Sequence, residues 1–217
     1  NEEAMASLRI SVKSKDPDLV GRMFTAKMVE LALANYPGLY MGGAVRSGGP
    51  VLVYWPALID SKHIKETVHI DGKEIDVMPT NQLNLEETYY QKQPVEMPPP
   101  PSGETLNKPL GELFGARSGD KGGCANIGVW AKNQNAFSFL NNYLTIEKIK
   151  ELMPDISEFK IDRYELPNIL SLNFYIHDIL EDGVSSNTRK DGQAKSLGEY
   201  LRAKYADIPK SLLEENI

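Results

Sequence analysis

One short segment concentrates residue types that can bind and act on an anionic ligand. Residues 117–123 run Arg-Ser-Gly-Asp-Lys-Gly-Gly. The glycines permit positive φ angles and a close approach of a ligand to the backbone, and successive N–H groups in such a turn can hold an anion. Arg117 can bind a phosphate or carboxylate with two hydrogen bonds, and Lys121 can add a point charge. The sequence therefore predicts an anion-binding loop.

Further polar residues extend the predicted site. Asp120 can orient a cation, accept a proton or bind a metal, and Asn126 can present its amide to a carbonyl group. The expected substrate-binding residues of the segment are Arg117, Ser118, Gly119, Lys121, Gly122 and Asn126, with Asp120 as a catalytic candidate. An alternative stays open, in which the segment is a tight hairpin whose Asp120 and Lys121 form a solvated ion pair of little energetic worth. The sequence lacks the Walker A spacing and makes no case for nucleotide hydrolysis.

Two neighbouring features could complete a site. On a strand, Asn173, Tyr175 and His177 would share one face, where Asn173 can bind substrate and His177 can act as an acid or base. The alternative is a strand face that touches only solvent or a helix end.

Cys124 directly follows the glycines of the 117–123 segment, but a small buried cysteine is commoner than a nucleophilic one. No paired histidine or cysteine spacing predicts a metal site, and no cofactor is assigned.

Composition narrows the functional classes. Of the 217 residues, 41% are hydrophobic and 25% charged, as expected for a globular protein with a core. The net charge is −6 with no Lys/Arg cluster, which argues against nucleic acid or an anionic membrane as the main partner. The single cysteine excludes an intramolecular disulfide and indicates a reducing, cytoplasmic compartment. No apolar run reaches the roughly 18 residues of a membrane-spanning helix.

The first part of the chain predicts a strand, a helix and further strands. Residues 8–13 alternate apolar and polar side chains, as a half-buried strand does. Asp16–Pro17 suits the start of a helix, which apolar spacing carries to about Asn35. Residues 51–55 resemble a buried strand. Asp71–Gly72, between two apolar runs, predicts a β-hairpin.

The middle of the chain predicts a boundary. Residues 82–108 have no periodic pattern and include Pro98–Pro101, which favours an extended polyproline segment. A linker or surface strap explains this run better than an SH3-type ligand does. We therefore expect a first unit at residues 1–81, a linker at 82–108 and a second domain at 109–217.

The second domain predicts an α+β fold with helices on one face of one sheet. Thr145 suits a helix N-cap, and Pro154 should end that helix. The expected elements are strands at 110–114 and 127–130, helices at 136–144 and 146–153, strands at 159–164 and 170–176, a loop at 183–192, and a last helix marked by Leu197, Leu201 and Tyr205. The chain as a whole is expected to form two small sheet-plus-helix units, and the second has the order β-β-α-β-β-α.

The second domain contains a series of motifs in a defined order. They are Pro109-Leu110-Gly111, residues 116–123, 125–129, 163–167 and 172–174, His177, Asp191, and residues 195–198. Taken together, these motifs resemble the C-terminal ferredoxin-like domain of the acyclic terpene utilisation AtuA family. Residues 8–80, notably 54–59 and 68–72, resemble the end of that family's N-terminal region. Relatives are much longer, so the resemblance implies that this chain is a C-terminal part. Ala194 stands where the family favours glycine, and Glu181-Asp182-Gly183 replaces a glycine-rich stretch.

The resemblance implies a role in the bacterial breakdown of acyclic terpenes or branched acyl-CoA compounds, and two hypotheses follow. In the first, the chain is part of a catabolic enzyme whose loop holds a small anionic substrate such as an acyl-CoA. In the second, it is a non-catalytic assembly module that docks onto an upstream region or a second subunit, as in a homo-oligomer. Convergence of the loop with Asn173 or His177 on a pocket favours the first, whereas solvent-facing Asp120 and Lys121 favour the second.

Overall fold

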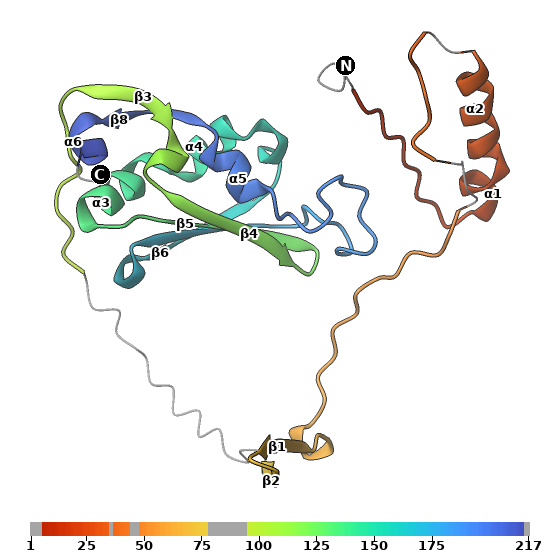
Figure 1. Cartoon of the computed structure of the whole chain (residues 1–217), viewed down its shortest axis with the longest axis horizontal. Helices are drawn as coiled ribbons and strands as arrows, with labels where there is room; N and C mark the ends of the chain where they lie inside the picture. The colour runs from red at the N-terminus through yellow and green to blue at the C-terminus, as the bar shows by residue number, and fades with distance from the viewer. Residues whose placement is uncertain (1–5, 35–36, 44–47, 78–94, 215–217) are drawn as a thin grey trace. The chain divides into compact units, whose positions relative to one another are not determined.

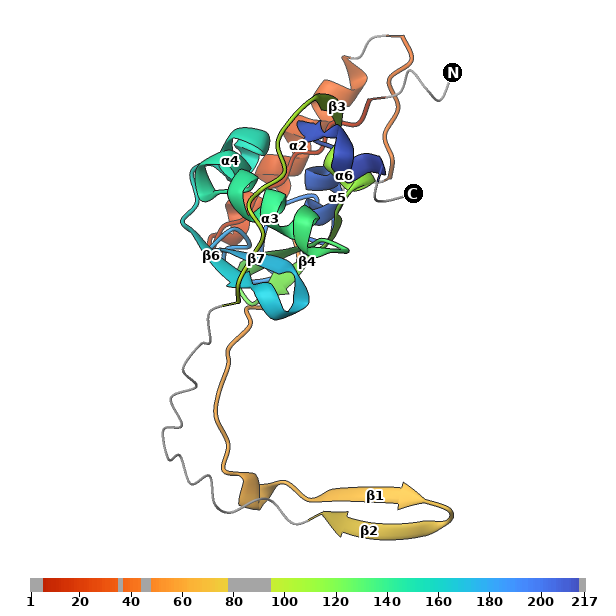
Figure 2. The same ribbon diagram turned by 90° about the vertical axis from the view of Figure 1, so that its left-hand side faces the viewer.

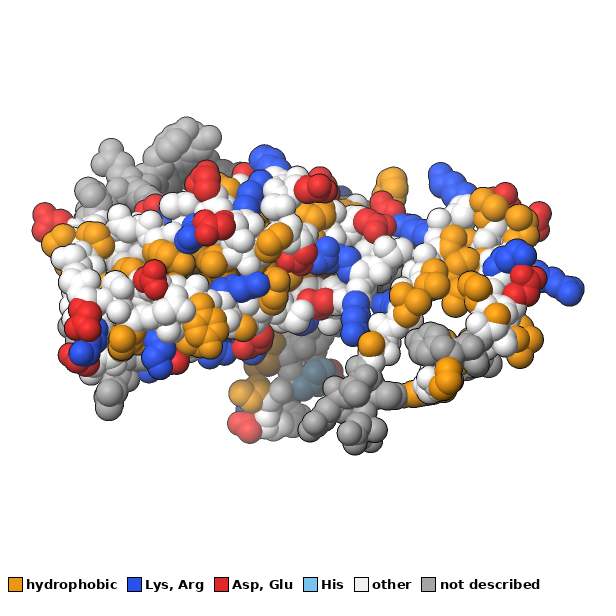
Figure 3. Space-filling model, turned by 90° about the horizontal axis from the view of Figure 1, so that it is seen from above, with side chains coloured by type: hydrophobic (Ala, Val, Ile, Leu, Met, Phe, Trp, Pro, Cys, Tyr) orange, Lys and Arg blue, Asp and Glu red, His pale blue; other side chains and the backbone are white. Residues whose placement is uncertain are grey.

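The computed structural model describes residues 6–34, 37–43, 48–77 and 95–214 (Figure 1). The chain divides into two compact units, residues 1–54 with 97–217 and residues 55–96. Mixed helix and strand content confirms the α+β class. Among the described residues, every helix is too short or too polar to cross a membrane. Figure 3 shows Lys and Arg side chains interspersed with Asp and Glu over the face in view.

The N-terminal helix begins where the sequence predicts. The Asp16 carboxylate accepts a hydrogen bond from the N–H of Asp18, and Pro17 opens α1 (Pro17–Val20). Gly21 separates α1 from α2 (Arg22–Leu33). The strands predicted at 8–13 and 51–55 are wrong, because both segments are extended chain without a partner strand among the described residues. No described residue between 6 and 54 is buried, so the apolar side chains of both segments have no core to face.

The second unit contains the predicted hairpin. Strands β1 (Glu66–Ile70) and β2 (Lys73–Val77) pair antiparallel (Figure 2), preceded by the 3-10 turn η2 (Ser61–His63). Asp71 and Gly72 both have positive φ angles, 49° and 73°, as a two-residue turn of this type requires. Local turn chemistry was therefore sufficient to predict this element.

The main sheet of the C-terminal part has four antiparallel strands in the order β4-β5-β7-β6. Helices lie on one face of it (Figure 1), and the chain order confirms the predicted β-β-α-β-β-α pattern. The elements are β4 (Gly115–Lys121), β5 (Cys124–Trp130), α3 (Gln134–Tyr143), α4 (Ile146–Leu152), η4 (Pro154–Ile156), β6 (Ile161–Leu166), η5 (Pro167–Ile169), β7 (Ser171–Ile176) and α5 (Leu197–Arg202). A second, two-stranded sheet pairs β3 (Thr105–Pro109) with β8 (Tyr205–Pro209), and α6 (Lys210–Glu214) follows.

The core lies between the main sheet and its helices. Alternate residues of β5 and β7, including Ile127 and Phe174, point toward the helices and are fully buried against Phe137 and Leu140 of α3. The helices have the caps that the sequence predicts, since the Thr145 hydroxyl accepts the N–H of Lys148 at the start of α4. Among the described residues of the C-terminal part, the helices lie on this one face of the main sheet (Figure 1).

Two predicted elements of this part are wrong. Residues 110–114 form the 3-10 turn η3 (Leu110–Glu112) and its exit, not a strand. They are drawn into the core, because the N–H of Leu110 bonds to the carbonyl oxygen of Lys204 and the side chain is buried. Tyr205, expected on the last helix, begins β8 opposite Pro109. The division at 82–108 stays a prediction, although β3 already begins within that range.

Candidate functional site

The predicted anion-binding loop is a β-hairpin. Residues 117–121 belong to β4, and only Gly122 and Gly123 form the turn between Lys121 and Cys124. Gly122 has a φ of +67°, as a tight turn requires. In an extended strand, successive N–H groups point in opposite directions and do not converge on one anion. Residues 117–121 therefore do not form a nest of converging N–H groups, and anion binding by this segment stays a prediction.

The register of the hairpin sorts the predicted residues onto two faces. Directly opposed residues share a face, and Ser118 and Asp120 lie opposite Ile127 and Ala125, on the side of the helices. The remaining residues belong to what we call the outer face. Its members are Gly115, Arg117, Gly119 and Lys121 of β4, Cys124, Asn126, Gly128 and Trp130 of β5, Ser171, Asn173 and Tyr175 of β7, and Asp162, Tyr164 and Leu166 of β6.

Two predicted amides meet on the outer face. The side chain of Asn126 donates a hydrogen bond of 2.8 Å to the side-chain oxygen of Asn173. Neither amide lines the pocket of Ala116, Arg117 and Ser118 described below. The structure thus brings Asn126 and Asn173 together, but as partners of each other.

His177 follows β7 and has a partner that the sequence did not reveal. Its Nε2 lies 2.7 Å from a carboxylate oxygen of Asp162 on β6. The hydrogen bond to His177 is the main cause that lowers the pKa of Asp162. Desolvation opposes it, and nearby Lys160 adds a further lowering effect. Asp120 lies on the other side of the sheet, so the two predicted catalytic residues, Asp120 and His177, are not brought together. The alternation in residues 159–164 placed Asp162 on a strand, but only the register with β7 places it beside His177.

Cys124 has Tyr175 rather than a histidine as its neighbour. A hydrogen bond to the Cys124 thiol, together with burial, raises the pKa of Tyr175. The N–H of Asp178 also lies 3.5 Å from the sulfur. The Tyr175 and His177 rings meet edge to face, 4.9 Å between centroids. These contacts give Cys124 a polar setting without the adjacent base that activates a nucleophilic thiol.

At the edge of the sheet, α5 packs closely against β4. The Ser118 hydroxyl accepts a hydrogen bond of 2.9 Å from the N–H of Gly198. A Cβ atom at Gly198 would lie 3.2 Å from three backbone atoms of Arg117, tighter than most such contacts. Glycine at this position therefore allows the helix to approach the strand. Ser118 acts here as a structural link between segments 80 residues apart in the sequence.

A small pocket opens at this junction, and we call it the edge pocket. Its volume is about 300 Å³, and it is lined by Ala116, Arg117, Ser118, Lys195, Gly198 and Glu199. Arg117 is exposed and forms no ion pair with any described residue. Lys195 Nζ lies 4.0 Å from Asp120, at the limit of an ion pair, while Glu199 is engaged by Arg202 at 2.8 Å. The edge pocket is thus lined by two basic residues, Arg117 and Lys195, and by Ser118, whose hydroxyl already accepts the Gly198 N–H.

Lys195 was missed as a site residue, although it belongs to the matched motif 195–198. Asp191 positions it, because one carboxylate oxygen accepts the N–H of Lys195 at 3.0 Å and the other accepts the N–H of Ser196 at 2.9 Å. Burial alone would raise the pKa of Asp191, but the bonds from Ser196 and Lys195 outweigh it and lower that pKa. Because Lys195 lies far from Arg117 along the sequence, residue spacing alone cannot show that the two line the same pocket.

Lys121 and Gly122 stay outside the edge pocket. The Lys121 ammonium is exposed and donates a hydrogen bond to the backbone oxygen of Asp120. Gly119 leaves room for the Lys195 ammonium group, because a Cβ atom at position 119 would lie 2.9 Å from Lys195 Nζ. Within the described part of the chain, no group of three histidine, cysteine or acidic side chains could hold a metal ion. Of the predicted set, only Arg117 and Ser118 line this pocket.

Comparisons with known proteins agree with the fold. Residues 108–206 match the family model of the AtuA ferredoxin-like domain. Residues 1–70 match the model of the acyclic terpene utilisation family protein AtuA. The chain matches none of the curated proteins and none of the solved structures. The two family matches together take in most of the chain.

Proposed function

The chain belongs to the acyclic terpene utilisation AtuA family, and from this premise we propose that it takes part in the breakdown of acyclic terpenes and related branched acyl-CoA compounds. In this proposal, the edge pocket binds the anionic part of the ligand. The observation that carries it is the meeting of Arg117 and Lys195 at one pocket, with Arg117 unpaired among the described residues.

The chemistry of the pocket suits a phosphate or carboxylate group. Arg117 offers a planar fork of donors, and Lys195 offers a point charge. The small volume of about 300 Å³ fits a charged group such as the diphosphate of CoA rather than a whole acyl-CoA. Asp120, which lies beside Lys195, is the candidate for proton transfer at the edge pocket. His177 and Asp162 would transfer protons on the outer face of the sheet.

Calorimetric titration of CoA into the protein tests the proposal. Because a hydrogen bond to a charged group contributes about 1.5 to 3 kcal/mol, Arg117→Ala and Lys195→Ala should each weaken binding by roughly ten- to a hundredfold. Lys121→Ala is the matched control, since it removes a cation from the same strand outside the pocket. If Arg117→Ala binds CoA as well as the wild type does, the edge pocket is not the site.

A second candidate function has its own observation. The described residues between 6 and 77 bury no side chain, and Trp55 is 86% exposed while Leu33 is 83% exposed. Exposed apolar surface of this extent marks an interaction site. We propose as the alternative that this region is an assembly module for an upstream region or a second subunit. Light scattering after size exclusion tests it, and a strict monomer that also fails to bind a separately produced upstream region contradicts it.

A further inference from the structure

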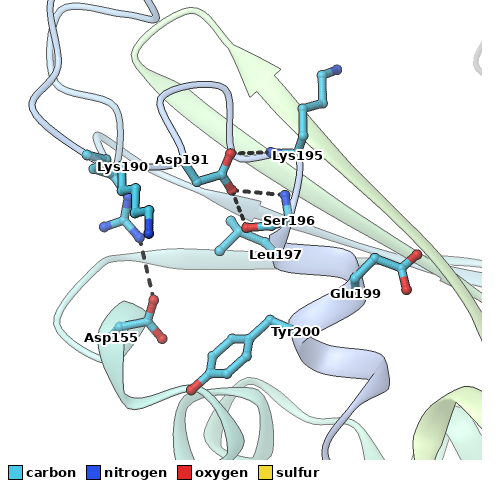
Figure 4. A pocket seen from close by; sticks show the side chains of 9 residues that line it. Asp155, Lys190, Asp191, Lys195, Ser196, Leu197, Glu199 and Tyr200 are labelled. Carbon is cyan, nitrogen blue, oxygen red and sulfur yellow. Dashed lines mark hydrogen bonds and ion pairs between the residues drawn. The ribbon is translucent and has the colours of Figure 1, made fainter. Parts of the chain in front are cut away.

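We propose that a second hollow beside the edge pocket binds the 3′-phosphorylated adenosine end of a CoA molecule. This hollow, which we call the loop pocket, has a volume of about 1090 Å³. Arg189 and Lys190 line it from the loop before α5, Leu197 and Tyr200 from α5, and Asp155 from η4 (Figure 4). The inference rests on the proposed function, because it assigns a further part of the same ligand.

The charges of the loop pocket leave cations available to a ligand. Lys190 forms no ion pair with any described residue, and Arg189 contacts Asp155 at 3.5 Å in a loose, partly exposed pair. The acidic side chains that line the hollow have internal partners. Asp191 accepts bonds from the N–H groups of Lys195 and Ser196 (Figure 4), and Glu199 pairs with Arg202. A phosphate group would therefore meet Arg189 and Lys190 without displacing a strong ion pair.

The floor of the loop pocket suits a flat ring. Leu197 and Tyr200 both line it from α5, and Leu197 lies nearer the Asp191 turn (Figure 4). Because Leu197 is 4% exposed, the ring of Tyr200 is the surface open to a ligand. Tyr200 is 41% exposed, and Lys204 Nζ lies 3.8 Å from its ring centroid, which holds the ring in place. Stacking of a base on an aromatic side chain contributes to binding without any demand on base identity. A ring floor with cations at the rim fits a phosphorylated nucleoside.

The loop that carries Arg189 and Lys190 is held together by its own hydrogen bonds. Twenty residues, 177–196, separate β7 from α5, a length that in compact domains usually has a functional reason. The side-chain amide of Asn187 donates to the carbonyl oxygens of Gly183 and Gly192, at 2.9 and 3.0 Å, and its oxygen accepts the N–H of Arg189. These bonds hold the loop in one shape before any ligand arrives, which reduces the entropic cost of binding.

The two pockets adjoin, because both are lined by Lys195 and Glu199. A ligand with two separate phosphorylated groups and a ring near one of them matches the basic residues of both pockets and the ring of Tyr200. CoA carries a diphosphate, an adenine ring and a 3′-phosphate. We place the diphosphate at Arg117 and Lys195, and the 3′-phosphate at Arg189 and Lys190.

Calorimetric titration with CoA and with dephospho-CoA, which lacks only the 3′-phosphate, tests this placement. Wild-type protein should bind CoA more tightly than dephospho-CoA by roughly tenfold or more. The double variant Arg189→Ala/Lys190→Ala should bind the two ligands equally, at the wild-type affinity for dephospho-CoA. Lys132→Ala removes an exposed cation that lines neither pocket and should keep the wild-type preference. Circular dichroism checks that each variant is folded.

The contrary outcomes separate the two proposals. If wild-type protein binds CoA through Arg117 but does not distinguish it from dephospho-CoA, the loop pocket assignment is wrong and the edge pocket stands. The same holds if the double variant keeps the full preference for CoA. If the wild type binds neither ligand, both the edge pocket and the loop pocket assignments for CoA are wrong.

Discussion

Two β-hairpins of this chain, β1–β2 and β4–β5, each have a two-residue turn but draw their stability from different sources. Strands β1 and β2 join through Asp71 and Gly72, and strands β4 and β5 join through Gly122 and Gly123, so each turn has two residues. In the first hairpin, every side chain but that of Thr67 is exposed. In the second, alternate residues of β5 are buried beneath the helices. The same local shape is held by turn chemistry in one case and by a hydrophobic core in the other.

This difference decides what each hairpin can do. An isolated two-stranded hairpin is marginally stable in water, so β1 and β2 depend on their turn and on exposed pairs such as Lys65 with Asp76 at 3.2 Å. Strand β4 is fixed by β5 on one edge and by α5 packed against it. Binding side chains such as Arg117 need the second kind of support, because a site must keep its geometry when the ligand is absent.

Matched isoleucine substitutions should produce the largest contrast. Ile127 in β5 is fully buried, whereas Ile75 in β2 is 53% exposed. Ile127→Ala should lower the free energy of unfolding by about 2 to 5 kcal/mol, through lost burial and a residual cavity. Ile75→Ala should change it by less than about 0.5 kcal/mol. Urea unfolding followed by far-UV circular dichroism measures both, and comparable losses would contradict the contrast.

Substitutions of the turn glycines should give the second-largest difference in stability between the two hairpins. A Cβ atom at Gly123 would overlap the backbone oxygen of Glu181, so Gly123→Ala must displace the loop and should cost about 1 to 3 kcal/mol. Gly72 has open space around it but a φ of +73°, so Gly72→Ala adds about 1 kcal/mol of local strain.

The measurement differs for the two glycines. Gly123→Ala should lower the urea midpoint of the whole C-terminal part. Gly72→Ala should speed amide hydrogen exchange in β1 and β2 alone and leave that midpoint in place. A shift of the midpoint by Gly72→Ala would mean that the two hairpins unfold together.

A smaller contrast concerns two hydroxyl groups. The Ser118 hydroxyl accepts the N–H of Gly198 at 2.9 Å in a half-buried position, whereas that of Thr67 donates to Asp76 at 3.2 Å on an exposed strand. Ser118→Ala should cost about 1 kcal/mol, because it leaves the Gly198 N–H without this acceptor. Thr67→Ala should change stability little, since water replaces the bond. Thermal unfolding compares them, and an equal shift would show that the β4–α5 link contributes nothing.

Sequence patterns predicted the elements whose signals are local. Asp71–Gly72 has the residue types that its turn demands, and Thr145 and Pro154 mark the limits of α4. Patterns failed where tertiary context decides. Residues 8–13 alternate as a half-buried strand does and residues 51–55 are apolar as a buried strand is, but neither has a described partner strand.

The site was predicted in part, for the same reason. Residues 117–123 looked like a loop because glycine and charge are frequent there, but pairing with β5 extends them as far as Lys121. The sequence identified Arg117 and Ser118, which line the edge pocket. It could not connect them to Lys195, because that proximity depends on how α5 packs against β4.

The smallest predicted effect is electrostatic. The bond from His177 holds the pKa of Asp162 below its ordinary value of 3.8, although both side chains of the pair are partly exposed. Because the folded-state pKa is lowered, the stabilisation is present above pH 3.8 and is lost as the pH falls through the folded-state pKa. Carboxyl-detected NMR titration should show the pKa of Asp162 rising toward 3.8 in His177→Ala. The control is His69→Ala in the first hairpin, where the imidazole faces Glu74 across β1 and β2 at 3.3 Å. It should leave the titration of Asp162 unchanged, and an unchanged Asp162 pKa in His177→Ala as well would show that the imidazole does not hold that carboxylate.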